Sequence, residues 1–141
     1  MRHQPIDDLG ATAALTLVKS QTLSRRERLE RWAELLEREP HRRLKALWRV
    51  EFVAEAERAL IRADDSPISL AFADPVLRGA GLEGDRLGDA EKFFELSSEQ
   101  AHHLLCDCHY YGRMDGETVA HRVRAAIDPP RPQRFFRDLF G

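Results

Sequence analysis

The sequence predicts an all-α fold, a single-domain helical bundle of about five to seven helices with a Gly/Pro-rich middle connection. Two capping boxes begin at Ser24 and Ser97, each with Glu or Gln three residues later. Apolar residues recur three and four positions apart behind both boxes, as they do on one face of a helix. With 141 residues, 43% of them hydrophobic and 33% charged, the chain has the length and composition of one globular domain.

The first half of the chain is predicted to form three helices. Asp7 or Asp8 is the expected N-cap of the first. The second starts at Ser24 and keeps a single apolar stripe, which consists of Leu29, Trp32, Ala33 and Leu36. Pro40 suits the first position of a third helix, which is expected to run to about Ala63. The apolar face of this third helix is long and consists of Leu44, Leu47, Trp48, Phe52, Ala56, Ala59 and Leu60.

The middle of the chain, residues 64–88, is predicted to be a connection made of short helical turns. Pro67 and Pro75 each restart the backbone, and four glycines follow them. An apolar alternation over residues 68–72 also fits a strand, but a lone strand would have no partner. We therefore expect helical turns, one of them capped by Asp74 with Pro75 at its first position.

The last third of the chain returns to a helical pattern. Asp89 is expected to start a short helix, and the capping box at Ser97 opens another that ends at Gly112. Asp115 is the predicted N-cap of the final helix, whose apolar stripe is Val119, Val123, Ala126 and Ile127. Two prolines after Asp128 prevent this helix from continuing.

The stretch HHLLCDCHYY, residues 102–111, concentrates the residues with metal or thiol chemistry. As a helix it would bury one stripe, formed by Ala101, Leu104, Leu105 and Cys108. The opposite, solvent-facing side would carry His103, Asp107 and Tyr110. Between the two lie His102, Cys106 and His109, at positions i, i+4 and i+7. The two cysteines point to different sides of such a helix, so no structural disulfide is expected.

The flank of His102, Cys106 and His109 is a candidate metal site, because imidazole and thiolate are ligands for zinc and similar ions. Its H-x3-C-x2-H spacing resembles the H-x3-C-x2-C of zinc-binding anti-sigma factors over eight residues, with His109 in place of that family's second cysteine. The fourth ligand stays open among His121, His41, Asp115 and water. The favoured interpretation is a histidine-rich helix without a cofactor, and zinc binding is the alternative.

The charge pattern argues against a dedicated nucleic-acid-binding protein. The net charge is −2. Residues 25–49 hold nine basic and five acidic side chains, whereas residues 51–100 hold five basic and twelve acidic ones. A nucleic-acid-binding domain is normally basic overall. An asymmetry of this kind suits contact between two halves of the chain, or between one subunit and its neighbour.

Residues 129–141 are predicted to form a Pro-rich spacer and an amphipathic tail, set apart from a helical domain over residues 1–128. The apolar residues of this tail are Phe135, Phe136, Leu139 and Phe140. Left in water, they would form an apolar patch of the kind that soluble monomers avoid. The tail is therefore expected to fold back on its own core or to insert into a groove of a partner chain.

These observations predict a small protein that acts through protein–protein interaction, as a homodimer or a partner-binding regulatory module. No catalytic set stands out, so enzymatic activity is not expected. No apolar run approaches the roughly 20 residues that span a bilayer, and the two cysteines are expected to stay reduced, so the cytoplasm is the expected location. Nineteen arginines against three lysines are typical of a bacterial sequence. The alternative function is a metal-dependent regulator or sensor that uses His102, Cys106 and His109.

Overall fold

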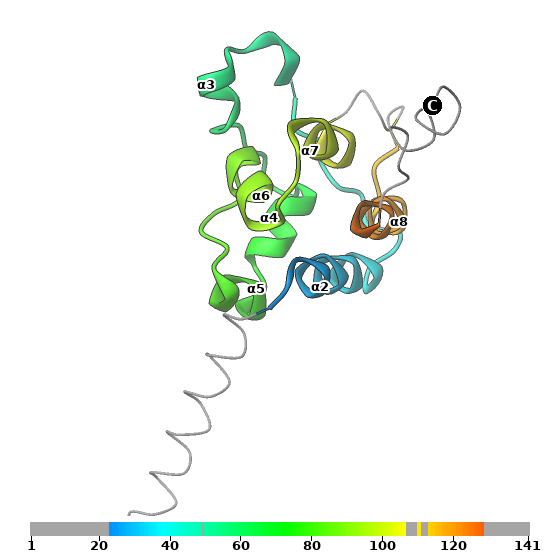
Figure 1. Cartoon of the computed structure of the whole chain (residues 1–141). Helices are drawn as coiled ribbons and strands as arrows, with labels where there is room; N and C mark the ends of the chain where they lie inside the picture. Colours follow the sequence, from blue (N-terminus) through cyan, green and yellow to red (C-terminus); the bar gives the residue numbers. More distant parts are fainter. Residues whose placement is uncertain (1–22, 49, 107–109, 111–112, 129–141) are drawn as a thin grey trace, which may run out of the picture.

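The structure is a computed structural model that describes residues 23–48, 50–106, 110 and 113–128. It confirms the all-α prediction, because these residues form seven α-helices and one 3-10 helix but no sheet. The helices are α2 (Arg25–Glu37), η1 (Val50–Phe52, the 3-10 helix), α3 (Glu55–Arg58), α4 (Pro67–Phe72), α5 (Pro75–Ala80), α6 (Leu87–Phe93), α7 (Ser98–Leu105) and α8 (Gly116–Ile127). Figure 1 shows α2 beside α8, and α3 at the end of the molecule away from α2.

The antiparallel pair of α2 and α8 is the frame of the fold. At one end of the pair, the Arg25 guanidinium donates to the carbonyl oxygens of Ala126 (3.1 Å) and Ile127 (3.3 Å). At the other end, Gly116 lies so close to α2 that a Cβ at this position would clash with the carbonyl oxygen of Leu36. The absence of a side chain at Gly116 therefore lets the two helices approach each other.

The core between this pair and the shorter helices is centred on Trp32 of α2, which is fully buried. Its ring stacks on Phe94, with the ring centroids 4.3 Å apart and 15° between the ring planes. Its indole N–H donates to the carbonyl oxygen of Pro67 at 2.9 Å. Phe93 packs edge-on against Phe94, with centroids 4.8 Å apart. A single side chain of α2 thus joins α4 to the end of α6.

The predicted capping residues accept the expected backbone N–H groups, and these residues are Ser24, Ser97, Asp74 and Asp115. Residues 67–80 form the two short helices α4 and α5, which confirms the prediction of helical turns in place of a strand. Gly81 directly follows α5 as its C-cap, and its φ of 121° lies in the region that favours glycine. The Pro- and Gly-rich connection is therefore helical at its beginning and turns at a glycine.

The predicted third helix over residues 40–63 is wrong, because most of this range is not helical and only η1 and α3 form there. The backbone N–H of Leu44 donates to the carbonyl oxygen of Met114 (2.9 Å), and that of Leu47 donates to Leu105 (2.8 Å). These distant partners replace the intrahelical bonds that the prediction required. Leu44 and Leu47 are buried, but the rest of the predicted apolar face is exposed, namely Trp48, Phe52, Ala56, Ala59 and Leu60.

The predicted helix from Ser97 to Gly112 also ends earlier than expected. α7 stops at Leu105, and Cys106 has the extended dihedral angles φ −103° and ψ 146°. Cys106 instead forms an isolated parallel bridge with Leu47. The premise that residues 98–111 form one continuous helix is therefore wrong from Cys106 onwards.

The prediction that Tyr110 faces solvent is also wrong, because this residue is buried. Its hydroxyl donates to the carbonyl oxygen of Leu104 at 2.7 Å, and the guanidinium of Arg122 lies 4.0 Å from the centroid of its ring. Burial raises the pKa of Tyr110 above its ordinary value. The phenol therefore stays protonated as a hydrogen-bond donor that ties the residues after α7 back to the helix.

Replacement of Tyr110 by Phe is expected to lower the free energy of unfolding by about 1 kcal/mol, because the ring stays and one buried hydrogen bond is lost. Urea unfolding followed by circular dichroism measures this change. A loss of about 3 kcal/mol or more would contradict this assignment, since one neutral hydrogen bond does not contribute that much.

Candidate protein-interaction surface

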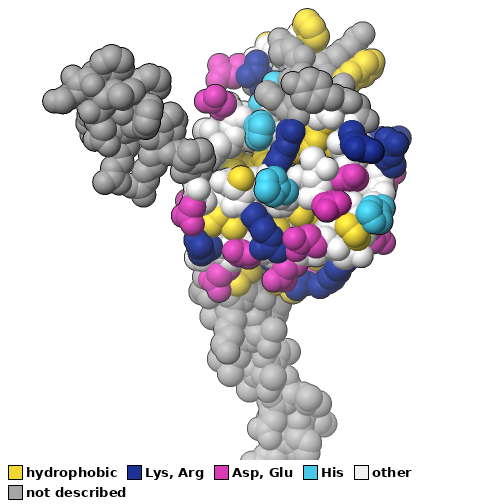
Figure 2. Space-filling model, turned by 90° about the vertical axis from the view of Figure 1, so that its right-hand side faces the viewer, with side chains coloured by type: hydrophobic (Ala, Val, Ile, Leu, Met, Phe, Trp, Pro, Cys, Tyr) yellow, Lys and Arg dark blue, Asp and Glu magenta, His cyan; other side chains and the backbone are white. Residues whose placement is uncertain are grey.

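Three large hydrophobic side chains are exposed in the part of the chain that the structure describes, and all three lie within residues 48–60. Trp48 is 68% exposed, Phe52 is 79% exposed and Leu60 is 60% exposed. Ala56 is exposed between them, so these residues follow one another at intervals of four. We call Trp48, Phe52, Ala56 and Leu60 the α3 surface. In Figure 2, hydrophobic side chains stand out at the end of the molecule where Figure 1 places α3.

Helix α3 has no buried residue. Its position therefore depends on hydrogen bonds to the residues that directly follow it. The backbone N–H groups of Leu87 and Gly88, at the start of α6, donate to the carbonyl oxygens of Ile61 (2.8 Å) and Ala59 (2.9 Å). A Cβ on Gly88 would lie 2.8 Å from the Cβ of Ala59, so only glycine permits this approach. The segment is therefore held by its backbone, while its apolar side chains stay outside the core.

An ion pair fixes the chain directly after α3. Arg62 donates to both carboxylate oxygens of Asp85, through Nε and Nη2 at 2.9 Å each. These hydrogen bonds hold the pKa of Asp85 below its ordinary value, although burial acts in the opposite direction. The α3 surface is thus presented from a segment that is anchored at its end.

A hollow of about 220 Å³ adjoins this segment. Its lining comes from η1, α3, α6 and α7 and consists of Val50, Arg58, Leu87, Glu91, Ser98, Glu99 and His102. The Nε atom of Arg58 is buried and has no hydrogen-bond partner among the described residues. Buried polar atoms without partners are rare in folded proteins, so this donor suits an acceptor supplied from outside the domain.

The surroundings of the α3 surface are acidic. Glu55 and Glu57 are exposed on α3 itself, and Glu91 and Glu99 line the hollow. Arg58 is the basic side chain of that lining. An apolar surface with an acidic border favours a partner that combines apolar anchors with positive charge.

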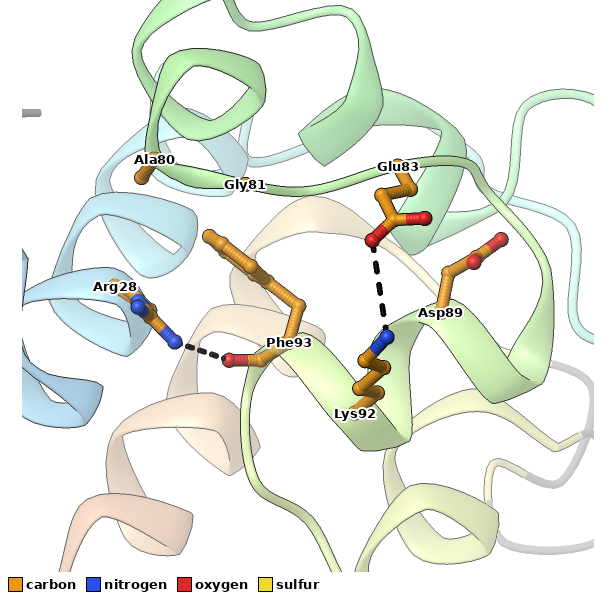
Figure 3. A pocket seen from close by; sticks show the side chains of 7 residues that line it. All are labelled: Arg28, Ala80, Gly81, Glu83, Asp89, Lys92 and Phe93. Carbon is orange, nitrogen blue, oxygen red and sulfur yellow. Dashed lines mark hydrogen bonds and ion pairs between the residues drawn. The ribbon is translucent and has the colours of Figure 1, made fainter. Parts of the chain in front are cut away.

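A second hollow, of about 160 Å³, is lined by Arg28, Ala80, Gly81, Glu83, Asp89, Lys92 and Phe93 (Figure 3). Arg28 Nη1 donates to the carbonyl oxygen of Phe93 at 2.9 Å, and its guanidinium lies 4.6 Å from the centroid of the Phe93 ring. Lys92 Nζ lies 3.7 Å from Glu83 Oε1. These contacts join α2, α6 and the loop between α5 and α6, so we assign this hollow a structural role.

The predicted metal ligands are placed only in part. His102 is half-buried on α7 and lines the hollow beside α3, whereas Cys106 is 1% exposed and lies in the core. His109 lies outside the described residues, as do Asp107 and Cys108. The described residues contain no group of three or more His, Cys, Asp or Glu side chains that could hold a metal ion. Binding of zinc by His102, Cys106 and His109 stays a prediction, without the helix geometry on which it was based.

The predicted partner-binding residues Phe135, Phe136, Leu139 and Phe140 also lie outside the described residues. Residues of the α3 surface were not predicted as a site, because the sequence pattern assigned them to the buried face of a long helix. The face of the molecule in Figure 2 shows basic side chains interspersed with acidic ones.

No protein-family model, curated protein or solved structure matches this chain. Among the described residues, no helix has the length and apolar character needed to cross a membrane.

Proposed function

We propose that the protein is a cytoplasmic protein-interaction module of bacterial type that acts as a homodimer, with the α3 surface as its contact. The observation that supports this proposal is the exposure of Trp48, Phe52 and Leu60 on one short segment. Tryptophan and other aromatic residues are enriched at the centres of interfaces, where a few buried anchors supply most of the binding energy. The adjoining hollow adds a concave region that can receive one such anchor.

The proposal also explains why the segment is anchored through its backbone. A surface that must bind a partner needs its apolar side chains outside the core and yet held in position, since ordering them on binding would cost affinity. The hydrogen bonds from Leu87 and Gly88 and the pair of Arg62 with Asp85 restrain the segment without covering it. In a two-fold symmetric homodimer, the same surface is used on both subunits.

The test replaces Phe52 by Glu and measures the molar mass by light scattering over a range of protein concentrations. The wild-type protein is expected to dimerise. The dissociation constant of the variant dimer is expected to be at least about tenfold higher, which corresponds to a loss of about 1.4 kcal/mol of association free energy. A buried carboxylate without a partner would oppose association. Because Phe52 is 79% exposed, the free energy of unfolding of the variant should equal that of the wild-type protein when both are measured at concentrations where they are monomeric.

The matched control is Ala73→Glu, which adds the same charge at an exposed position next to α4. It should leave the wild-type dimer intact. A wild-type protein that is monomeric at all concentrations would contradict the proposal. A dimer that is equally weakened by both substitutions would show that net charge, and not the α3 surface, controls association.

A further inference from the structure

We infer that the element that occupies the α3 surface is the C-terminal tail, residues 129–141, of the second copy. This inference rests on the proposed homodimer and adds the identity of the docking segment. Two tails would then be exchanged reciprocally, each inserting its phenylalanines against α3 and the adjoining hollow of the other copy. Four features of the protein support the assignment: the apolar content of the tail, its charge, the unpaired donor of Arg58 at the hollow, and the position of the tail.

The apolar content of the tail matches what the surface needs. The spacing of Phe135, Phe136, Leu139 and Phe140 would place them on one face of a helix, the pattern of helices that bind in grooves. Each phenylalanine buries about 150–250 Å² when it leaves water. The three phenylalanines of each of two tails therefore supply about 900–1,500 Å², close to the roughly 1,200–2,000 Å² of a stable interface.

The charges of the two surfaces are opposite. The tail holds Arg131, Arg134 and Arg137 against one acidic residue, Asp138, which gives it a net charge of +2. The α3 surface is bordered by four carboxylates and one guanidinium, those of Glu55, Glu57, Glu91, Glu99 and Arg58. Opposite charges around an apolar centre raise the association rate and select the orientation of the partner.

The unpaired donor of Arg58 also fits a docked chain segment. Its Nε atom is buried at the hollow and has no hydrogen-bond partner among the described residues, and a peptide carbonyl or the carboxylate of Asp138 would supply the acceptor. A tail that docks there would therefore remove an unfavourable feature of the isolated domain, because a buried donor without an acceptor is destabilising.

The position of the tail favours the second copy over its own domain. The last described residue, Asp128, pairs with Arg26 at 2.9 Å, which places the end of α8 at the start of α2. Figure 1 shows α3 at the end of the molecule away from α2. Pro129, Pro130 and Pro132 follow directly, and proline-rich segments extend at about 3.1 Å per residue as stiff spacers. Such a stiff spacer favours contact of the tail with another copy, because contact with α3 of its own domain would require the chain to reverse direction.

The experiment uses a full-length variant in which Phe135, Phe136 and Phe140 are replaced by Ala, together with a fluorescent synthetic peptide of residues 129–141. The variant is expected to be monomeric in light scattering. The peptide is expected to bind to this variant, and binding should weaken at least about tenfold when Phe52→Glu is added. Binding should also weaken as sodium chloride is raised, because the charge attraction is screened. A peptide that carries the same three alanines is the control.

The outcomes separate this inference from the proposed function. If the triple-alanine variant stays dimeric while Phe52→Glu gives a monomer, the homodimer stands and the tail is not its docking segment. If the wild-type protein is monomeric and the peptide binds only to the triple-alanine variant, the tail occupies the surface of its own chain and the exchange between copies is wrong. Failure of the peptide to bind to the triple-alanine variant would overturn the tail assignment.

Discussion

Replacement of Trp32 by Ala is expected to lower the free energy of unfolding by about 3–5 kcal/mol, the range observed when large buried aromatic side chains are truncated. Trp32 is fully buried, stacks on Phe94 and donates to the carbonyl oxygen of Pro67. Its removal leaves a cavity between α2, α4 and the end of α6 and deprives a buried carbonyl of its donor. Since small domains are stable by about 5–15 kcal/mol, the variant should lose a large share of its stability.

The comparison with Trp32→Phe divides this loss into its causes. Phenylalanine keeps a ring opposite Phe94 but has no N–H for Pro67, so it should cost less than alanine, about 1–3 kcal/mol. Urea unfolding followed by circular dichroism gives both values. If Trp32→Ala cost less than about 2 kcal/mol, the central position of this side chain in the core would be wrong.

The helix starts at Ser24, Ser97 and Asp115 were predictable from the sequence because capping is a local interaction. The prediction that Asp89 starts a helix is wrong by two residues, because α6 begins at Leu87 and Asp89 is its third residue. Ser24 accepts the backbone N–H of a residue three positions later, and the same holds for Ser97 and Asp115. Every atom of such a cap lies within four consecutive residues, so the residue types alone indicate it. The stripe of Leu29, Trp32, Ala33 and Leu36 was predicted for a similar reason and is buried.

The prediction of a third helix was wrong because the conformation of residues 40–63 depends on hydrogen-bond partners that are distant in the sequence. Leu44 and Leu47 have the spacing of a helix face, but their backbone N–H groups donate to Met114 and Leu105. Those carbonyl groups lie about sixty to seventy residues further along the chain, and local periodicity carries no information about them. Tertiary contacts commonly override local preference in this way.

The α3 surface lies in the same segment, residues 40–63, and the sequence did not predict it as a site for the same reason. A helix through residue 63 would have buried Phe52 and Leu60, so the pattern predicted core where the structure shows exposed surface. Cys106 was predicted on the flank of a helix but lies in the core, because α7 ends at Leu105 and Cys106 itself is extended and forms a bridge with Leu47. An apolar residue with helical spacing does not itself reveal whether its face is covered by the same chain or by another.

Replacement of Asp74 by Asn is expected to lower the free energy of unfolding by about 2–4 kcal/mol at pH 7, because it leaves the half-buried guanidinium of Arg31 without its carboxylate. Arg31 donates to Asp74 twice, through Nη2 to Oδ1 at 2.8 Å and through Nε to Oδ2 at 3.0 Å. Asparagine still caps α5, so a further loss of about 1 kcal/mol in Asp74→Ala measures the cap alone. Asp128→Asn is the control, because its pair with Arg26 is exposed and should contribute at most about 1 kcal/mol.

The pH dependence of the Asp74 variants gives a second, independent check of the same pair. Burial raises the pKa of the Asp74 carboxyl, but the hydrogen bonds from Arg31 and from the backbone N–H of Leu77 outweigh it, so the pKa lies below its ordinary value. The unfolded chain therefore binds this proton more tightly than the folded protein does. The contribution of Asp74 is complete above its unfolded pKa of about 3.9 and is lost as the pH falls through the lower folded value. The difference in stability between wild type and Asp74→Asn should accordingly narrow between pH 5 and pH 2.5, and a difference that stays constant over this range would show that the carboxylate is not stabilised by Arg31.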